Sequence, residues 1–247
     1  MQITQAVTNA SIIGITNMYD GLYGQYPNPF EAVPAKFNYN GTDGAIGYQG
    51  DVIFVMFSGS DSWQDWVQNF KFWEKPVVAS TVKKVKLAPF TFNFSNGIDS
   101  KILVEDGFQE HYLYAKDFIN QVTANYKKII VTGHSLGGAT ATLCAYDLKV
   151  HNPDKDITAV MFASPRVGNG NFVKSFNKII PDAIRYNYME DIVPKLPPLW
   201  MGYEHVASQQ EITTWKEKFE YDMKHPLIAL FGSPSFHDLR NYQKVIK

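Results

Sequence analysis

A short apolar strand and a helix meet at a glycine-rich turn near the middle of the chain. Lys128–Thr132 (KIIVT) is typical of a buried strand, and Leu136–Val150 has the apolar periodicity of a helix. The turn holds Ser135 between Gly133 and Gly137, the pattern Gly-x-Ser-x-Gly. A strand that turns this abruptly leaves no room for Cβ atoms beside the serine. This context predicts an α/β architecture with the Ser135 hydroxyl exposed at the turn.

Other apolar runs alternate with helical patterns in the same way. Further strands are predicted at Asp51–Phe57, Ile157–Ala163 and Ala183–Tyr188, and a further helix at Gly107–Asn125. Lys84–Phe94 and Lys101–Val104 are predicted as extra strands joined by a turn at Asn96-Gly97. The alternation predicts a central, mostly parallel sheet with helices on both faces. No repeat or change of composition divides the 247 residues, so we expect one domain over residues 1–247.

Charge and cysteine content exclude several classes of protein. The 23 Lys and Arg residues nearly balance 24 Asp and Glu residues, so the chain lacks the basic excess of a nucleic-acid-binding protein. Cys144 is the only cysteine, which excludes an intramolecular disulfide and a cysteine-rich metal site. It lies in an apolar helical run and is predicted to be buried. We find no metal-ligand cluster or phosphate-binding loop and expect neither a metal nor a cofactor.

The predicted cellular location stays open. The first residues lack the basic start and apolar stretch of a signal peptide, but a leader that had already been removed would leave the same appearance. Both a cytoplasmic protein and a secreted protein are therefore consistent with the sequence. No run reaches the roughly 18 apolar residues that span a bilayer, so we expect no transmembrane anchor.

A reactive serine needs a histidine that takes its proton and a carboxylate that orients this histidine. In α/β folds with this turn the order along the chain is serine, acid, histidine. His205, His225 and His237 all follow Ser135, and spacing alone does not choose among them. His134 adjoins the serine but is predicted to point elsewhere and to pack against its surroundings.

Asp191 is the predicted acid. It directly follows the strand Ala183–Tyr188, at the carboxyl edge where α/β sheets place their chemistry. The alternative interpretation is a turn residue before Pro194. Asp182 precedes that strand and falls at the wrong end, and Asp147 is predicted to lie on the solvent-facing side of its helix.

Several segments together resemble the class 3 lipases, the fungal-type triacylglycerol lipases of the α/β-hydrolase superfamily. The similar segments, in chain order, are Phe57–Ser62 with Asp65-Trp66, Gly107-Phe108, Gly133–Gly138, Ala163–Asn169, and Asp191–Pro194 with Leu196–Pro198. The resemblance implies an α/β-hydrolase fold with a helical lid, and an esterase that forms an acyl-enzyme intermediate.

The same resemblance implies a role for individual residues. Ser135 is the implied nucleophile, Asp191 the acid and His237 the base, with His205 as the fallback base. The oxyanion hole is implied to consist of the backbone N–H groups of Ser60 and Leu136. Loss of one such donor typically lowers the rate by about 10²–10³. The order of residues around His237 differs from the usual family order, and Ser58 stands where the family often has arginine.

Residues 61–75 are the predicted lid. Trp63, Trp66 and Phe70 fall on one face of a predicted helix that directly follows the implied oxyanion residue. We expect these aromatic side chains to cover Ser135 in water and to bind substrate when the lid opens. The alternative is a helix that packs permanently on the core.

The sequence favours acylglycerol esters at a lipid–water interface as the substrate, because of the lid aromatics. Soluble short-chain or aryl (feruloyl-type) esters and phospholipids remain alternatives, as does an inactive relative that binds lipid or protein. Leu196–Met201 and Pro226–Phe231 are apolar and either wall an acyl-chain pocket or belong to the core.

Overall fold

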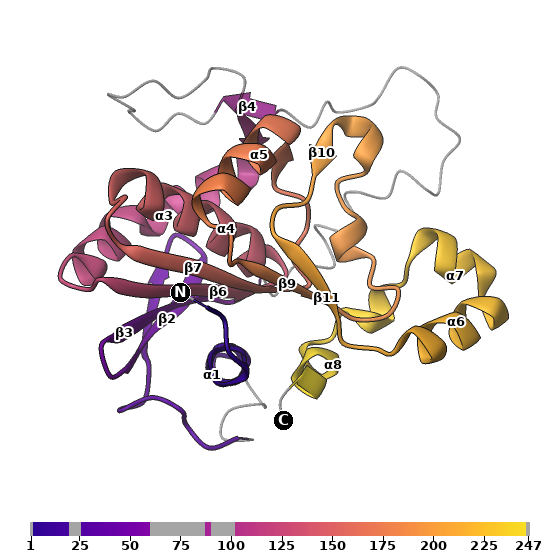
Figure 1. The fold of residues 1–247 in the computed structure, drawn as a ribbon, viewed down its shortest axis with the longest axis horizontal. Coiled ribbons are helices and arrows are strands. Elements are labelled where there is room, and N and C mark those ends of the chain that lie inside the picture. Colours follow the sequence, from indigo (N-terminus) through magenta and orange to yellow (C-terminus); the bar gives the residue numbers. More distant parts are fainter. Residues whose placement is uncertain (1, 20–25, 60–86, 90–101, 246–247) are drawn as a thin grey trace.

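The structure is a computed structural model that describes residues 2–19, 26–59, 87–89 and 102–245 (Figure 1). The predicted turn at Asn96-Gly97, the implied oxyanion residue Ser60 and the predicted lid over residues 61–75 lie outside these residues.

A seven-stranded sheet forms the centre of the described residues (Figure 1). Its strands, in spatial order, are β1 (Ala35–Tyr39), β2 (Thr42–Gln49), β3 (Val52–Phe57), β6 (Lys128–His134), β7 (Asp156–Phe162), β9 (Ile184–Asn187) and β11 (Ser208–Glu211). The strands β1, β2 and β3 pair antiparallel, whereas every pair from β3 to β11 is parallel. The predicted mostly parallel sheet is confirmed.

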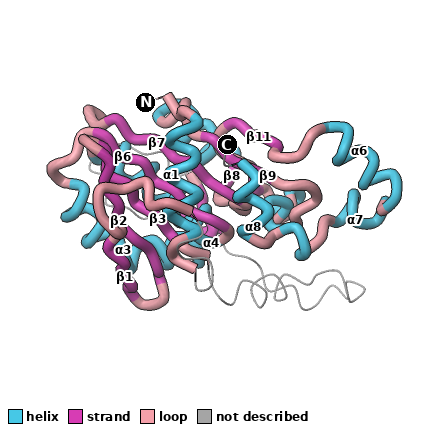
Figure 2. Tube along the Cα trace, turned by 90° about the horizontal axis from the view of Figure 1, so that it is seen from below, coloured by secondary structure: helices cyan, strands magenta, loops and turns pink. Residues whose placement is uncertain are grey.

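Helices cover both faces of this sheet, as predicted (Figures 1 and 2). The helices α3 (Asp106–Thr123), α4 (Leu136–His151) and α5 (Gly170–Ile179) lie on one face, and α1 (Gln5–Thr16) and α8 (Leu239–Tyr242) lie on the other. Each face has its own apolar cluster, and the sheet separates the two. The strands alternate between these clusters, so that Val55 packs on one face and Phe54 on the other.

A second, smaller sheet and a helical hairpin complete the described chain. The small sheet consists of β10 (Tyr203–Glu204), β8 (Gly168–Asn169), β5 (Leu103–Glu105) and β4 (Leu87–Pro89). The hairpin of α6 (Trp215–Lys224) and α7 (Pro226–Phe231) projects from one end of the molecule in both views. Short 3₁₀ turns lie at η1 (Val193–Lys195), η2 (Leu199–Met201), η3 (Pro234–Phe236) and η4 (Gln243–Val245). None of the described helices is both long and apolar enough to cross a bilayer.

The structure contradicts the predicted exposure of Asp147 and excludes one of the two alternatives for Pro226–Phe231. Asp147 is buried and not solvent-facing, because α3 covers that side of α4 and supplies hydrogen bonds from the Tyr112 hydroxyl (2.7 Å) and the Lys116 ammonium (3.0 Å). Pro226–Phe231 does not belong to the core, since Leu227 and Leu230 are largely exposed. Cys144 is buried as predicted. That residues 1–247 form one domain stays a prediction.

Candidate active site

Three parallel strands end side by side and bring separate parts of the chain to one edge of the sheet. In the strand register Phe57 of β3 lies beside Gly133 of β6, and His134 lies beside Phe162 of β7. The residues that follow these strands, among them Gly59 and Ser135, therefore meet at the carboxyl edge. This is the edge at which open α/β sheets bind ligands.

Ser135 occupies the sharp turn between β6 and α4 in a strained backbone conformation, with φ 60° and ψ −128°. Close packing explains the flanking glycines. A Cβ atom on Gly133 would come within 2.1 Å of the Gly137 carbonyl oxygen, and one on Gly137 within 2.4 Å of the Phe57 carbonyl oxygen. The turn thus places the Ser135 hydroxyl at the start of α4, where the helix dipole favours negative charge.

A chain of hydrogen bonds joins Ser135, His237 and Asp191. The Nε2 atom of His237 lies 2.7 Å from Ser135 Oγ, and its Nδ1 atom lies 2.9 Å from Asp191 Oδ2. All three side chains are buried, so the Ser135 hydroxyl is not exposed as the sequence predicted; it packs against His237. With Nδ1–H donating to the carboxylate, Nε2 carries the lone pair that faces the serine hydroxyl. The structure thus brings together the three residues that were predicted as nucleophile, acid and base.

Two further donors hold the Asp191 carboxylate in place. The Tyr242 hydroxyl donates to Oδ2 (2.5 Å), and the Val193 backbone N–H donates to Oδ1 (2.9 Å). Burial and the neighbouring Asp191 charge raise the pKa of Tyr242 well above its usual value, so the phenol keeps its proton and donates. Sequence reasoning missed Tyr242, although it lies in the same short segment as His237.

His134 packs against the imidazole of His237, with ring centroids 4.8 Å apart. Its Nε2 atom lies 3.1 Å from the His237 carbonyl oxygen, which only accepts, so Nε2 carries the hydrogen. Burial and then the neighbouring His237 lower the pKa of His134 well below its ordinary value, so its ring is neutral. The sequence predicted a packing residue here, without indicating that it packs on His237.

Tyr19 was also missed by the sequence analysis. Its hydroxyl accepts a hydrogen bond from the Gly59 backbone N–H (2.6 Å) and lies 3.5 Å from Nδ1 of His134. It therefore links the end of β3 to the histidine beside the nucleophile. The sequence analysis predicted no element near Tyr19, so no pattern indicated a role for it.

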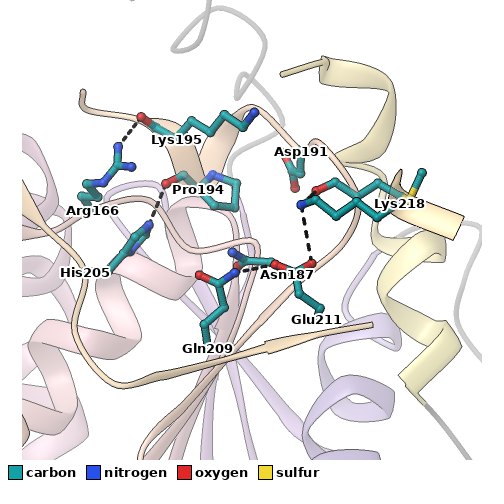
Figure 3. A pocket seen from close by; sticks show the side chains of 10 residues that line it. Arg166, Asn187, Asp191, Pro194, Lys195, His205, Gln209, Glu211 and Lys218 are labelled. Atoms are coloured by element: carbon teal, nitrogen blue, oxygen red, sulfur yellow. Dashed lines mark hydrogen bonds and ion pairs between the residues drawn. The ribbon is translucent and has the colours of Figure 1, made fainter. Parts of the chain in front are cut away.

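The two other candidate histidines lie elsewhere. His205 lines a polar cavity of about 170 Å³ behind Asp191, and its Nε2 atom donates to the Pro194 carbonyl oxygen (2.7 Å; Figure 3). Burial and the nearby Arg185 and Arg166 lower the pKa of His205 well below its usual value. His225 is exposed and stacks on Tyr221. Neither ring contacts Ser135.

Glu190, which precedes Asp191, connects the α6–α7 hairpin to the candidate site. Its buried carboxylate pairs with Lys195 of η1 and with Lys218 of α6, the latter at 2.9 Å. Lys195 Nζ also donates to the Ala229 carbonyl oxygen in α7 (3.0 Å). The pKa of Lys218 is raised: burial opposes its charge, but the hydrogen bond to Glu190 and the charges of Glu211 and Glu190 outweigh burial.

The remaining predicted site residues are only partly described. Leu136 is the first residue of α4, where helix N–H groups lack intrahelical acceptors. Ser60, Trp63, Trp66 and Phe70 lie outside the described residues. The last described residue before them, Gly59, packs against the turn, since a Cβ atom on it would lie 3.0 Å from Ser135 Cβ.

A buried serine–histidine–carboxylate chain at the carboxyl edge of a mostly parallel sheet is the arrangement of the α/β-hydrolases. The sequence profile of the class 3 lipases matches residues 54–201. The chain therefore belongs to the class 3 lipase family, as its motifs predicted.

Individual relatives and solved structures agree with this family. The secreted mono- and diacylglycerol lipase A of Penicillium cyclopium is 32% identical over 202 residues, which cover 74% of this chain and 58% of the relative. A lipase of Rhizomucor miehei is 30% identical over 177 residues, 68% of this chain and 44% of the relative. The chain thus spans about half the length of these curated relatives.

The crystal structure of a mutant form of the Penicillium cyclopium enzyme MDLA superposes with a TM-score of 0.64 at 26% identity, covering 85% of this chain and 78% of the other. A solved triacylglycerol lipase gives a TM-score of 0.65 at 22% identity, covering 93% and 91%. These likenesses confirm the predicted α/β-hydrolase fold.

Proposed function

We propose that the protein is a serine hydrolase of carboxylic esters, with acylglycerols as its principal substrates. The observation that carries this proposal is the chain from Ser135 Oγ through His237 to Asp191, with distances of 2.7 and 2.9 Å. A serine whose hydroxyl hydrogen-bonds to a carboxylate-oriented histidine is activated for attack on a carbonyl carbon. Class 3 lipase relatives named as acylglycerol lipases support the choice of ester.

In the proposed first step, Ser135 Oγ bonds to the ester carbonyl carbon while its proton passes to His237 Nε2. The carbonyl electron pair moves onto oxygen, where the Leu136 and Ser60 N–H groups stabilise the negative charge. The intermediate then expels the alcohol, which takes the proton from His237. A water molecule repeats these steps on the acyl-enzyme, releasing the carboxylic acid and restoring Ser135.

The neutral state of His134 supports this proton transfer. His237 becomes positively charged in the transition state, and the Asp191 carboxylate stabilises that charge. A second positive imidazole 4.8 Å away would oppose it. Because burial lowers the pKa of His134 well below its usual value, no such repulsion arises near neutral pH.

We further propose that the enzyme works at a lipid–water interface. Large apolar side chains are exposed along η2, α6 and α7, and we call them the apolar rim: Leu199, Trp200, Trp215, Phe219, Met223, Leu227, Leu230 and Phe231. An exposed apolar area of this kind favours contact with another apolar phase. The end of α7 lies close to Asp191, because Ser233, two residues after this helix, pairs with Asp191 in an isolated β-bridge. The exposed charges of α6 balance in sign, which suits an uncharged lipid surface.

The test of the hydrolase proposal combines labelling and turnover. The protein should react with a p-nitrophenyl organophosphonate at one serine, and the Ser135→Ala variant should not. Turnover of p-nitrophenyl butyrate should fall by about 10⁴–10⁶ in Ser135→Ala, while the unfolding temperature stays unchanged. Labelling of Ser135→Ala at the wild-type rate would reject Ser135 as the nucleophile. Soluble aryl esters turned over faster than emulsified acylglycerols would favour the alternative esterase function.

A further inference from the structure

The polar cavity of about 170 Å³ behind Asp191 has room for several groups of the size of a water molecule (Figure 3). Its lining comes from η1, β9, β11 and α6, together with Arg166 and His205. Arg166 and His205 lie on one side of the cavity, and the carboxylates of Asp191 and Glu211 lie on the other (Figure 3). The two sides therefore differ in charge.

Arg166 and His205 are held by backbone carbonyl groups of one short segment, yet each keeps a polar atom without a partner. Arg166 Nη1 donates to the carbonyl oxygens of Lys195 and Pro197, at 2.8 Å for Pro197. His205 Nε2 donates to the Pro194 carbonyl oxygen (2.7 Å). Within the described residues, the buried atoms Arg166 Nε and His205 Nδ1 have no hydrogen-bond partner. Buried polar atoms of this kind usually face an ion, water or a ligand.

A second arginine, Arg185 of β9, adds positive charge behind the cavity wall. Its Nη2 atom donates to the side chain of Gln209, which lines the cavity (3.3 Å). Neither Arg185 nor Arg166 pairs with a carboxylate in the part of the chain that the structure describes. Burial and the charge of Arg166 lower the pKa of Arg185 to about 10. The two guanidinium groups thus repel each other and have no paired anion.

The carboxylates on the other side of the cavity already have partners. Asp191 accepts hydrogen bonds from His237 and from the two further donors described above. Glu211 accepts one from the Gln209 side chain, and its other carboxylate oxygen lies 4.0 Å from Lys218 Nζ. These contacts occupy the negative charges, so they leave the positive charge of the guanidinium side without a partner across the cavity.

We propose that this cavity binds a small monovalent anion, such as chloride or a short-chain carboxylate, with Arg166 and His205 as its hydrogen-bond donors. The proposal is independent of the proposed function, because it includes no hydrolytic step. Arg166 donates through Nε, and His205 donates through Nδ1 once its ring has taken up a proton. The Asn187 amide also lines the cavity; its buried oxygen has no partner within the described residues, and a flip of the amide presents its NH₂ group.

The charge of His205 makes this binding depend on pH. Burial and then the charges of Arg185 and Arg166 lower the pKa of His205 well below its usual value. An anion beside the guanidinium groups opposes their effect and raises this pKa, so protonation of His205 in turn tightens anion binding. The charged groups around the ring and the cavity are Arg166, Arg185, Asp191, Lys195, Glu211 and Lys218. The anion should therefore bind more tightly as the pH falls, and it should stabilise η1, whose carbonyl groups hold both donors.

Binding is measured by NMR on the wild-type protein, through the Cε1–H signal of His205, which is the histidine signal absent from His205→Gln. We expect sodium chloride to shift this signal saturably, with an affinity at least about tenfold higher at pH 5 than at pH 7. Sodium formate should displace chloride, and the order of their affinities decides between a carboxylate and a halide as the preferred ligand. Sodium gluconate, whose six-carbon anion is far larger, should not shift the signal. Equal responses to chloride and gluconate, or equal chloride affinities at both pH values, would overturn the proposal.

Stability gives a second measurement. At pH 5 and constant ionic strength, replacing gluconate by chloride should raise the urea concentration at which half of the wild-type protein is unfolded, because the anion binds only the folded chain. His205→Gln retains an N–H group for the Pro194 carbonyl oxygen but lacks the second donor, so it should lose this effect. His225→Gln, at the exposed histidine, should keep it. A chloride effect of equal size in His205→Gln and the wild-type protein would overturn the proposal, and the NMR titration decides by itself if His205→Gln does not fold.

Discussion

Asp191 and His237, the proposed acid and base, lie at the two ends of one stretch of chain, and the middle of this stretch has a different surface. Asp191 and His237 are buried, and their polar atoms are paired with the chain itself. Between them, α6 and α7 project from the molecule (Figure 1). Six of the eight residues of the apolar rim lie on these two helices and are exposed. Glu190 and its two lysines join these parts. The site around Asp191 and His237 is thus held by internal polar contacts, whereas the exposed apolar side chains of α6 and α7 contribute little to folding.

The largest expected effect comes from a substitution in the buried site. Asp191→Asn removes the charge that orients and stabilises His237, so kcat should fall about 10⁴-fold. Steady-state hydrolysis of p-nitrophenyl butyrate measures the loss, and circular dichroism verifies folding. Asp182→Asn, an exposed carboxylate at the opposite end of β9, is the matched control. A loss below tenfold would contradict the assigned role of Asp191.

Glu190→Gln tests the ion pairs that connect the buried site to the α6–α7 hairpin. The variant leaves Lys195 and Lys218 without their common carboxylate. Because both lysines are about a third exposed, water solvates their charges and limits the loss of stability. We expect the free energy of unfolding in urea to fall by about 1–2 kcal/mol and limited proteolysis within α6–α7 to increase. Glu220→Gln, at an exposed site on α6, should affect neither measurement. Unchanged stability and proteolysis would show that Glu190 does not fasten the hairpin.

Acid pH should lower the free energy of unfolding through the buried histidines His134 and His205. His134 and His205 have pKa values well below that of a free histidine, so below about pH 6.5 the unfolded chain binds protons that the folded chain does not. Stability is therefore retained above pH 6.5 and lost as the pH falls, by up to about 1.4 kcal/mol per pH unit for each histidine. Urea titrations between pH 7 and 5 measure how the free energy of unfolding depends on pH. This dependence should be weaker in His205→Gln than in the wild-type protein, and the same as wild type in the exposed variant His225→Gln. Equal slopes in all three proteins would contradict this assignment.

The smallest expected effect on stability comes from the rim itself. Leu227→Ser changes a side chain that is 72% exposed, so the free energy of unfolding should shift by less than about 0.5 kcal/mol. Adsorption to acylglycerol emulsions and hydrolysis of them should nevertheless decrease several-fold, while hydrolysis of a dissolved ester does not. Leu113→Ser, an exposed leucine on α3, controls for general surface polarity. Unchanged adsorption would remove the rim from the proposed interface.

The sequence predicted the core of the sheet and the serine turn because these depend on local patterns. The four apolar runs and the two predicted helices have ends within a few residues of those in the structure. The strands could be predicted because a strand buried on both faces must be apolar along its length. Short elements such as β11 and α6 escaped prediction. Their residues are polar or mixed, and their positions depend on neighbours distant in sequence.

The sequence could rank candidate acids by their place after a strand, but it could not choose among three histidines from spacing. His237 is 102 residues from Ser135, and only the folded chain brings the two within 2.7 Å. The contacts from Tyr242, His134 and Tyr19 depend on the same long-range packing and left no pattern that a single sequence reveals.

The amino-acid sequence by itself determined the α/β class, the strained serine turn and the family, since each follows from apolar periodicity or from a local motif. Only the tertiary structure decided which histidine faces the serine, that Asp147 is buried and that Pro226–Phe231 lies at the surface. Burial and contact depend on which elements pack together, and an apolar or charged residue has the same local sequence pattern whether or not a neighbour covers it.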